Sequence, residues 1–180
     1  MSEPVPGSSR PEREAVVLVS RDLVRRLCRE AGASPRGRTN HNFHEPDDTY
    51  QRFLNAVQPG SYIQPHRHAV PPKSESFVVL QGQAGFFCFD EDGRLTQAVR
   101  VGPDADALAV DVRPGVWHTF FALCPDTVVF EGKNGPYDPH ADKAFGPWAP
   151  AESDPGAAEY MHRLIDALPA AGPAAGAARQ

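Results

Sequence analysis

The sequence lacks any apolar run that approaches the ~18 residues of a membrane-spanning helix. Its longest N-terminal apolar run, residues 15–19, is too short for the core of a signal peptide. That run also follows a segment rich in proline and glutamate. These absences predict a cytoplasmic protein that does not act in a membrane.

Basic residues are also few, and they form no block. The chain has 18 lysines and arginines against 23 aspartates and glutamates, which gives a net charge of -5. Nucleic-acid-binding domains usually carry a concentrated positive patch, so this composition argues against that class. The expected partner is a small molecule rather than a nucleic acid or a membrane.

Cysteine is scarce, since the chain has only Cys28, Cys88 and Cys124. Their odd number and wide spacing exclude a disulfide framework and a paired-cysteine zinc motif. We interpret them as free thiols in a reducing compartment, which agrees with a cytoplasmic location.

Turn-forming residues, by contrast, are abundant, with 19 prolines and 15 glycines. Turn signals about every 8–12 residues, with no helical segment between them, predict an antiparallel β-sandwich or barrel over residues 49–133. The expected strands are residues 50–57, 62–68, 75–80, 84–90, 95–101, 108–112, 117–123 and 127–133.

Other elements flank this β region. We expect a short strand at residues 15–19 and an amphipathic helix at 20–31 that Ser20 caps. A polar loop follows at 38–48, and a second amphipathic helix covers 157–168. The predicted organisation is a disordered arm (1–14), a single domain (15–152), a helical segment (153–168) and a disordered tail (169–180). Within the single domain, the strand-helix-loop covers 15–48, the barrel 49–133 and a C-terminal loop 134–152.

Two histidines form the centre of the predicted site. His66 and His68 lie two residues apart, and in an extended strand such residues point to the same face. Glu75 opens an apolar strand shortly afterwards, and His118 follows a turn much further along. Three imidazoles and one carboxylate on neighbouring strands predict a site for one divalent transition metal: iron, manganese, nickel, copper or zinc.

Alternation from His118 sends Trp117 and Phe121 to the opposite face of the same strand. If His118 faces the interior of a barrel, these two large side chains lie outside it. Either a terminal helix or a second copy of the chain must then cover them, so a homodimer is one possibility.

The spacing of these residues resembles the two sequence motifs of the cupin superfamily. The first motif reads Gly-x5-His-x-His, then Glu-x6-Gly, and the second reads Pro-Gly-x-x-His. The residues concerned are Gly60, His66, His68, Glu75 and Gly82 in the first motif, and Pro114, Gly115 and His118 in the second.

The wider chain, over about residues 15–152, resembles the WbuC-type cupin metalloproteins. The segments that carry this narrower resemblance are residues 38–44, 52–55, 131–137 and 145–150. The resemblance implies an antiparallel jelly-roll (cupin) barrel, here with an N-terminal and a C-terminal helix. It also implies a central metal held by His66, His68, Glu75 and His118.

Two departures from the cupin pattern bear on this site. The connection from His68 to Glu75 is longer than usual and contains Pro71-Pro72, so three histidines and water are an alternative ligand set. Ala122 also stands where cupins usually have an asparagine after the last histidine.

Further residues are candidates for chemistry beside the metal. His44 is a candidate acid or base, or a wall of the pocket, although an exposed loop histidine is the alternative. Glu131 and Lys133 share one face of the last strand. Facing inward, they can bind or protonate a substrate, whereas facing outward they form a solvated pair.

Four other residues are candidates for substrate binding. The predicted loop carries Arg38, Asn40 and Asn42, whose side chains can hydrogen-bond a polar substrate at the mouth of the barrel. A structured turn explains the two asparagines equally well. Tyr62 shares the predicted strand face of His66 and His68, where it lines the cavity or serves packing alone.

These features predict a metal-dependent enzyme of the isomerase or epimerase type that acts on a small polar molecule. The WbuC resemblance suggests, by association, a sugar or nucleotide-sugar of polysaccharide (O-antigen-like) biosynthesis. One alternative is a non-catalytic, metal-dependent sensor that binds a small molecule. A second is an iron dioxygenase.

Overall fold

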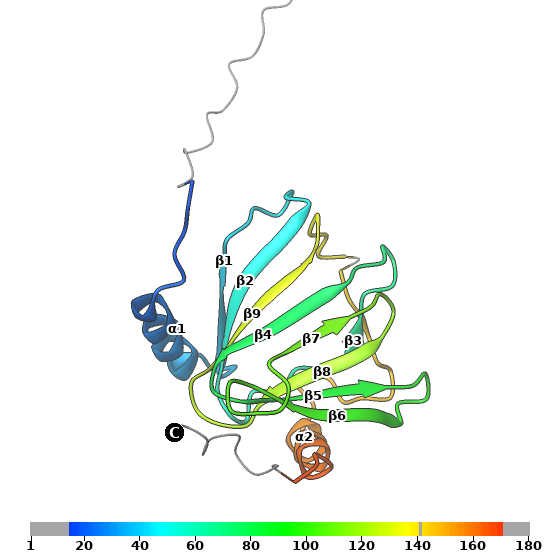
Figure 1. The fold of residues 1–180 in the computed structure, drawn as a ribbon. Coiled ribbons are helices and arrows are strands. Elements are labelled where there is room, and N and C mark those ends of the chain that lie inside the picture. Colours follow the sequence, from blue (N-terminus) through cyan, green and yellow to red (C-terminus); the bar gives the residue numbers. More distant parts are fainter. Residues whose placement is uncertain (1–14, 141, 171–180) are drawn as a thin grey trace, which may run out of the picture.

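The fold is mainly β, as a computed structural model describes it for residues 15–140 and 142–170 (Figure 1). The predicted arm lies outside the described residues, and so does the predicted tail apart from residues 169–170. The elements are α1 (Arg21–Ala33), β1 (Arg38–Asn42), β2 (Tyr50–Val57), β3 (His66–Arg67), β4 (Glu75–Gln81), β5 (Ala84–Phe89), β6 (Leu95–Val101), β7 (Ala109–Val112), β8 (Trp117–Ala122), β9 (Thr127–Asn134), β10 (Ala144–Phe145) and α2 (Ala157–Asp166).

The strands form two five-stranded antiparallel sheets. The first has the order β1-β2-β9-β4-β7 and the second the order β10-β3-β8-β5-β6. Without the outermost β1 and β10, the remaining eight strands have the order of a double-sheet jelly roll, the architecture of the cupins. The predicted antiparallel jelly roll with a helix on each side is therefore confirmed.

An apolar core fills one part of the space between the two sheets. Residues on inward positions of both sheets make up this cluster: Val57, Phe77, Val79, Ala84, Phe86, Val101, Val112, Phe120, Ala122 and Val129. Strand alternation places these residues inside, since successive side chains point to opposite faces. The same inner faces carry the polar residues of the site described below.

Each helix covers the outer face of one sheet (Figure 1). The side chain of Ser20 accepts a hydrogen bond from the Leu23 amide at 3.2 Å and so caps α1. α1 then buries Leu27 and Ala31 against Leu54 of β2. α2 packs on the second sheet, where Phe121 is fully buried. α2 therefore covers Phe121, as one of the two sequence-based alternatives requires, whereas Trp117 packs against Trp148 of the loop before α2.

Neither helix is long and apolar enough to cross a bilayer.

Three sequence-based expectations about local structure are wrong. Residues 38–42 form the edge strand β1 rather than a loop, because β2 supplies a complete antiparallel ladder to these polar residues. Residues 15–19 form no strand, since no ladder pairs with them in the described chain. Of the strand expected at 62–68, only His66–Arg67 is regular.

Candidate metal centre

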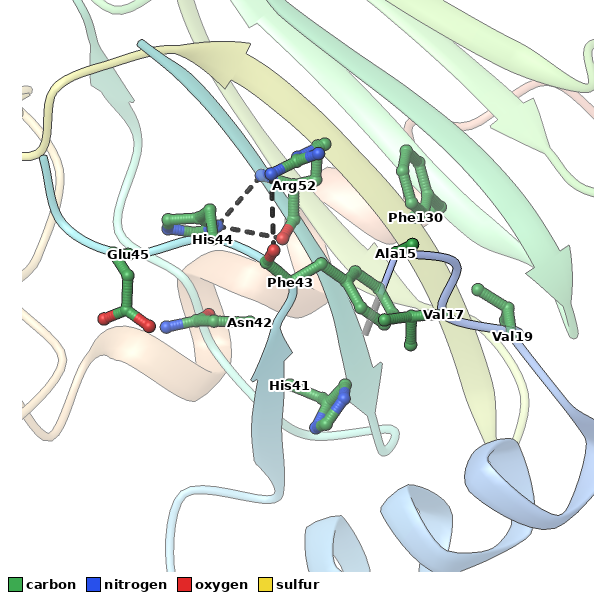
Figure 2. A pocket seen from close by; sticks show the side chains of 10 residues that line it. All are labelled: Ala15, Val17, Val19, His41, Asn42, Phe43, His44, Glu45, Arg52 and Phe130. Carbon is green, nitrogen blue, oxygen red and sulfur yellow. Dashed lines mark hydrogen bonds between the residues drawn. The ribbon is translucent and has the colours of Figure 1, made fainter. Parts of the chain in front are cut away.

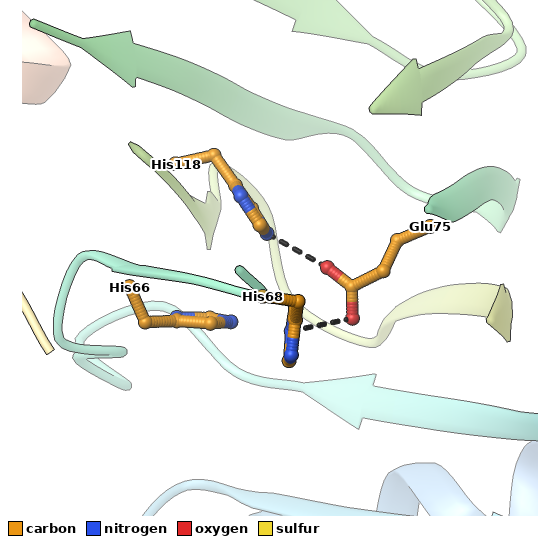
Figure 3. Close-up of side chains that lie close together, drawn as sticks. All are labelled: His66, His68, Glu75 and His118. Carbon is orange, nitrogen blue, oxygen red and sulfur yellow. Dashed lines mark ion pairs between the residues drawn. The ribbon is translucent and has the colours of Figure 1, made fainter. Parts of the chain in front are cut away.

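The four predicted metal ligands come together from both sheets. His66 on β3 lies directly opposite His118 on β8, because the two residues are Cα partners in the second sheet. His68 follows β3, and Glu75 opens β4 in the first sheet. One nitrogen or oxygen from each of the four side chains lies within 4.8 Å of the others. The longer connection through Pro71-Pro72 therefore still brings Glu75 to the cluster (Figure 3).

Glu75 bridges two of the imidazoles. Its Oε1 lies 2.9 Å from His68 Nε2, and its Oε2 lies 2.8 Å from His118 Nε2. Both contacts are drawn in Figure 3. Glu75 and His68 are each 2% exposed and His118 is 1% exposed, so water cannot screen these groups. The charged form of a carboxylate survives such burial only with a positive partner.

The opposite edge of each imidazole faces a main-chain carbonyl. Nδ1 contacts the carbonyl of Gln64 in His66 (3.0 Å), of Asp142 in His68, and of Val116 in His118 (2.9 Å). A carbonyl only accepts, so each Nδ1 is the donor, and in a neutral ring Nε2 then carries the lone pair. Burial lowers the pKa of His66 well below its ordinary range, and the charge of Lys143 lowers it further. This arrangement orients imidazoles as metal ligands.

The central atoms of this cluster are the ones without hydrogen bonds. His68 Nε2, His118 Nε2 and both carboxylate oxygens of Glu75 are buried and have no hydrogen-bond partner among the described residues. Leaving a buried polar atom unsatisfied costs about 1–3 kcal/mol, and more for a charged group. A cation among them would satisfy these atoms together. The cluster can therefore hold a metal ion, and its donors suit a divalent first-row transition metal.

A family model described as a domain of unknown function (DUF6016) matches residues 19–101, less than half of the chain. No curated protein matches the chain.

Several solved structures are similar in part. The capsular polysaccharide assembling protein CapF from Staphylococcus aureus is 25% identical, with a TM-score of 0.49 over 59% of this chain and 28% of CapF. KdgF from Halomonas sp. is 20% identical, with a TM-score of 0.45 over 56% of this chain and 82% of KdgF. Oxalate decarboxylase from Bacillus subtilis is 17% identical, with a TM-score of 0.47 over 60% of this chain and 27% of the decarboxylase. The chain thus spans less than a third of CapF and of the decarboxylase, and its own strand order establishes the jelly roll.

A cavity of about 620 Å³ leads to the cluster and reaches it at His66. Six further residues predicted to act in catalysis or substrate binding line this cavity: Arg38, Asn40, Asn42, His44, Glu131 and Lys133. Because residues 38–42 are a strand, the first three of these alternate along β1 and face the same side. The strand that the sequence did not predict is therefore what aligns them.

Glu131 and Lys133 face inward, and each is 6% exposed. Burial raises the pKa of Glu131 to about 8, and the neighbouring charge of Glu75 adds to this effect. Asn55 Nδ2 donates a hydrogen bond of 2.6 Å to Glu131 Oε2. At neutral pH Glu131 thus holds its proton and can give it up in a reaction.

Lys133 makes contacts with two carboxylates. Its Nζ lies 2.8 Å from Asp142 Oδ2 and 3.6 Å from Glu75 Oε1. Burial alone lowers the pKa of Lys133, but the negative charges of Glu75 and Asp142 oppose this and raise it, and Glu131 adds to the rise when it is ionised. Lys133 therefore remains an ammonium ion beside the cluster.

His44 lines this cavity and also a second pocket, which residues 15–19 help to form. Its Nδ1 accepts a hydrogen bond of 2.9 Å from the Arg52 amide (Figure 2). Nδ1 is therefore occupied, and Nε2 is the nitrogen left for a ligand. His44 can therefore contact a bound molecule through Nε2.

Tyr62 does not line the cavity with the other candidates, which corrects the prediction from strand alternation. Its ring stacks on Phe121 at 5.8 Å, under α2, and its hydroxyl donates a 2.8 Å hydrogen bond to the Pro150 carbonyl. The alternation fails because the chain between Tyr62 and Pro65 is not a regular strand. Tyr62 therefore belongs to the packing of the C-terminal helix.

The sequence reasoning missed several residues of the site. Asp142 and Lys143 lie in the segment predicted as loop, whose pattern carries no signal for an inward position. Gln51 and Asn55 did leave a signal, because they alternate with Phe53 in a predicted strand and so share its face. Polar residues on the inner face of a core strand indicate a site rather than packing.

Proposed function

We propose that this protein is a metal-dependent enzyme that moves a proton on a small polar molecule, in an isomerisation or epimerisation. The observation that carries this proposal is one geometric relationship. One cavity brings together three kinds of group. They are the four-residue cluster that could hold a metal, which the cavity reaches at His66, the buried and protonated acid Glu131, and the buried ammonium ion of Lys133. Acid-base catalysis needs a group whose pKa lies near the operating pH, and Glu131 has that property.

The side chains have separate roles in this proposal. His66, His68, Glu75 and His118 would hold a divalent metal, which supplies a Lewis acid to polarise a carbonyl or hydroxyl oxygen. Glu131 transfers the proton to or from the substrate carbon or oxygen. The ammonium group of Lys133 stabilises the negative charge that develops during this transfer. Asn55 orients Glu131 through its hydrogen bond.

The substrate that we propose is a sugar or nucleotide-sugar related to polysaccharide biosynthesis. The resemblance to WbuC-type cupins supports this class by association, as does the polar lining of the cavity. We further propose that the protein works in the cytoplasm. The apolar residues Val78, Leu80 and Leu108 remain exposed and are available to a homodimer.

The first test is elemental analysis of the full chain, wild type beside His66→Ala. His162→Ala is the matched control, because His162 is exposed on α2. We expect about one divalent metal per chain in the wild type and in the control, and clearly less in His66→Ala. Equal metal content in all three proteins would mean that His66 does not help to hold a metal, and the proposed mechanism would then fail.

The second test measures proton transfer directly. Metal-loaded protein is incubated in D₂O with a panel of sugars and nucleotide-sugars, and NMR detects deuterium at carbon. We expect exchange in the wild type and at least a ~100-fold loss in Glu131→Gln, since general acid-base catalysis contributes about 10²–10⁴-fold. Glutamine keeps the acceptor for Asn55, so metal content should not change.

Two further measurements separate the alternative functions. Tight binding of a ligand without exchange would indicate a sensor. Oxygen uptake after addition of ferrous iron with a catechol or a thiol would indicate a dioxygenase. Either result would overturn the isomerase proposal.

A further inference from the structure

Lys143 occupies a fixed position beside the candidate metal centre. The residue before it, Asp142, is bound to Lys73 and Lys133, each at 2.8 Å. The residue after it, Ala144, pairs with Arg67 in the ladder between β10 and β3. Both neighbours of Lys143 in the sequence are therefore held, and its exposed side chain lines the same cavity as His66.

The cavity holds more basic than acidic side chains, although the whole chain has a net charge of -5. The basic side chains in its lining are Arg36, Arg38, Lys133 and Lys143, and the acidic ones are Glu131, Asp142 and Glu152. Positive charge concentrated in a cavity attracts anions and raises their local concentration.

Among the basic side chains that line this cavity, all except Lys143 form an ion pair with a described residue. Glu152 forms ion pairs with Arg36 and Arg38. Asp142 forms ion pairs with Lys133 and Lys73. Lys143 makes no hydrogen bond or ion pair within residues 15–140 and 142–170. Desolvation and the nearby charge of Lys133 lower the pKa of Lys143, so an anionic ligand group at this place would favour its ammonium form and be attracted to it.

The wall that the first sheet contributes to the cavity carries three amide side chains. Asn40 and Asn42 alternate on β1, and Gln51 lies on the neighbouring β2. Gln51 is 1% exposed, and its Nε2 has no hydrogen-bond partner among the described residues. A buried amide donor that is unsatisfied is unfavourable, so a ligand oxygen at this place would stabilise the complex. Amide groups both donate and accept, which suits hydroxyl groups.

We propose that the cavity binds an anionic, hydroxyl-rich small molecule, with its carboxylate or phosphate at Lys143 and its hydroxyl groups along Asn40, Asn42 and Gln51. This inference rests on the proposed function in one respect: it places the ligand beside the same candidate metal cluster. Carboxylate and phosphate share the chemistry that recognises an ammonium ion, and the experiment distinguishes them.

The experiment is a binding titration with zinc-loaded full chain, followed by calorimetry and ligand-observed NMR. The ligands are neutral hexoses (glucose, galactose and mannose), the matching hexuronates, and the matching hexose 1-phosphates. We expect at least one acid to bind about tenfold more tightly than its neutral hexose. The uronates and the phosphates are separate arms, so the preferred anion follows from which arm binds.

Two variants locate the anion. Lys143→Gln should abolish the preference for the acid, whereas Lys143→Arg should retain most of it. Arg94→Gln is the matched control for loss of one positive charge, because Arg94 lies on the exposed β5–β6 turn outside the cavity. Gln51→Ala should weaken the acid and the neutral sugar alike, since Gln51 contacts hydroxyl groups.

Three results would overturn this inference: no acid binds, acids and neutral sugars bind equally, or Lys143→Gln retains the preference. These outcomes are distinct from failure of the proposed function. Metal content and deuterium exchange are measured separately, so an acid that binds at Lys143 without exchange leaves this inference standing and removes only the proposed catalysis.

Discussion

The main-chain carbonyl of Asp142 faces Nδ1 of His68, across 74 residues of sequence. This contact joins the segment after β9 directly to a candidate metal ligand. The carboxylate of the same aspartate binds two buried lysines, Lys73 and Lys133. Asp142 therefore connects the orientation of an imidazole to the charge balance of the site.

Replacement of this carboxylate is our first prediction. Asp142→Asn should lower the free energy of unfolding by about 3–5 kcal/mol, because it leaves the buried Lys73 without an anionic partner and Lys133 with only the longer contact to Glu75. It should also weaken metal binding by about 10–100-fold, as other changes around metal-bound histidines do. Chemical denaturation and competition with a metal chelator measure the two effects.

Asp104→Asn is the control, since Asp104 is exposed. If Asp142→Asn matches this control in both stability and metal affinity, the network around Asp142 does not position His68.

Removal of the metal is our second prediction. The cluster is buried and its central atoms lack hydrogen bonds among the described residues, so a bound metal stabilises the folded chain. At a free metal concentration of 100 times Kd, the added stability is about 2.7 kcal/mol. Chelation should therefore lower the Tm of the wild type, and added metal should restore it.

His66→Ala should show no such response, because it lacks one of the four ligands. A Tm that falls equally in both proteins on chelation would mean that the metal acts elsewhere.

Alkaline pH provides our third prediction. Burial raises the pKa of Tyr62 above its ordinary value and that of Tyr160 to about 12. In the unfolded chain these groups lose their protons near pH 10. Stability from these tyrosines is thus fully present below about pH 10 and falls as the pH rises towards 12, because the unfolded state releases protons that the folded state retains.

Thermal unfolding between pH 9 and pH 11.5 tests this dependence. Tyr62→Phe should lose less stability over that interval than the wild type does. Tyr50→Phe is the control, since Tyr50 is 51% exposed. Parallel curves for the wild type and both variants would contradict the role of Tyr62.

Packing of α1 on the first sheet is our fourth prediction. Leu54 is fully buried beneath α1, whereas Leu18 is 76% exposed. Leu54→Ala should lower the free energy of unfolding by about 2–5 kcal/mol through lost burial and the cavity left behind. Leu18→Ala should change it by less than about 0.5 kcal/mol. Urea denaturation compares the two, and similar values would mean that α1 does not pack as described.

The predicted fold and the four-residue cluster depended on features that are local in the sequence. Turn residues at short intervals indicated the strands, and strand alternation placed Glu75 and Phe77 on one face. The same rule failed at Tyr62, because only His66–Arg67 of the expected strand is regular. Alternation is reliable only where a ladder holds the backbone extended.

The sequence by itself determined the antiparallel β character, both helices and the residue types that can hold a metal. Only the tertiary structure decided that residues 38–42 form an edge strand, that Glu131 and Lys133 face inward, and that Asp142 and Lys143 reach the site. The physical reason is that these positions depend on pairing and ion pairs between segments far apart in the chain. Local propensity and periodicity report only on neighbours along the sequence, and long-range contacts override them.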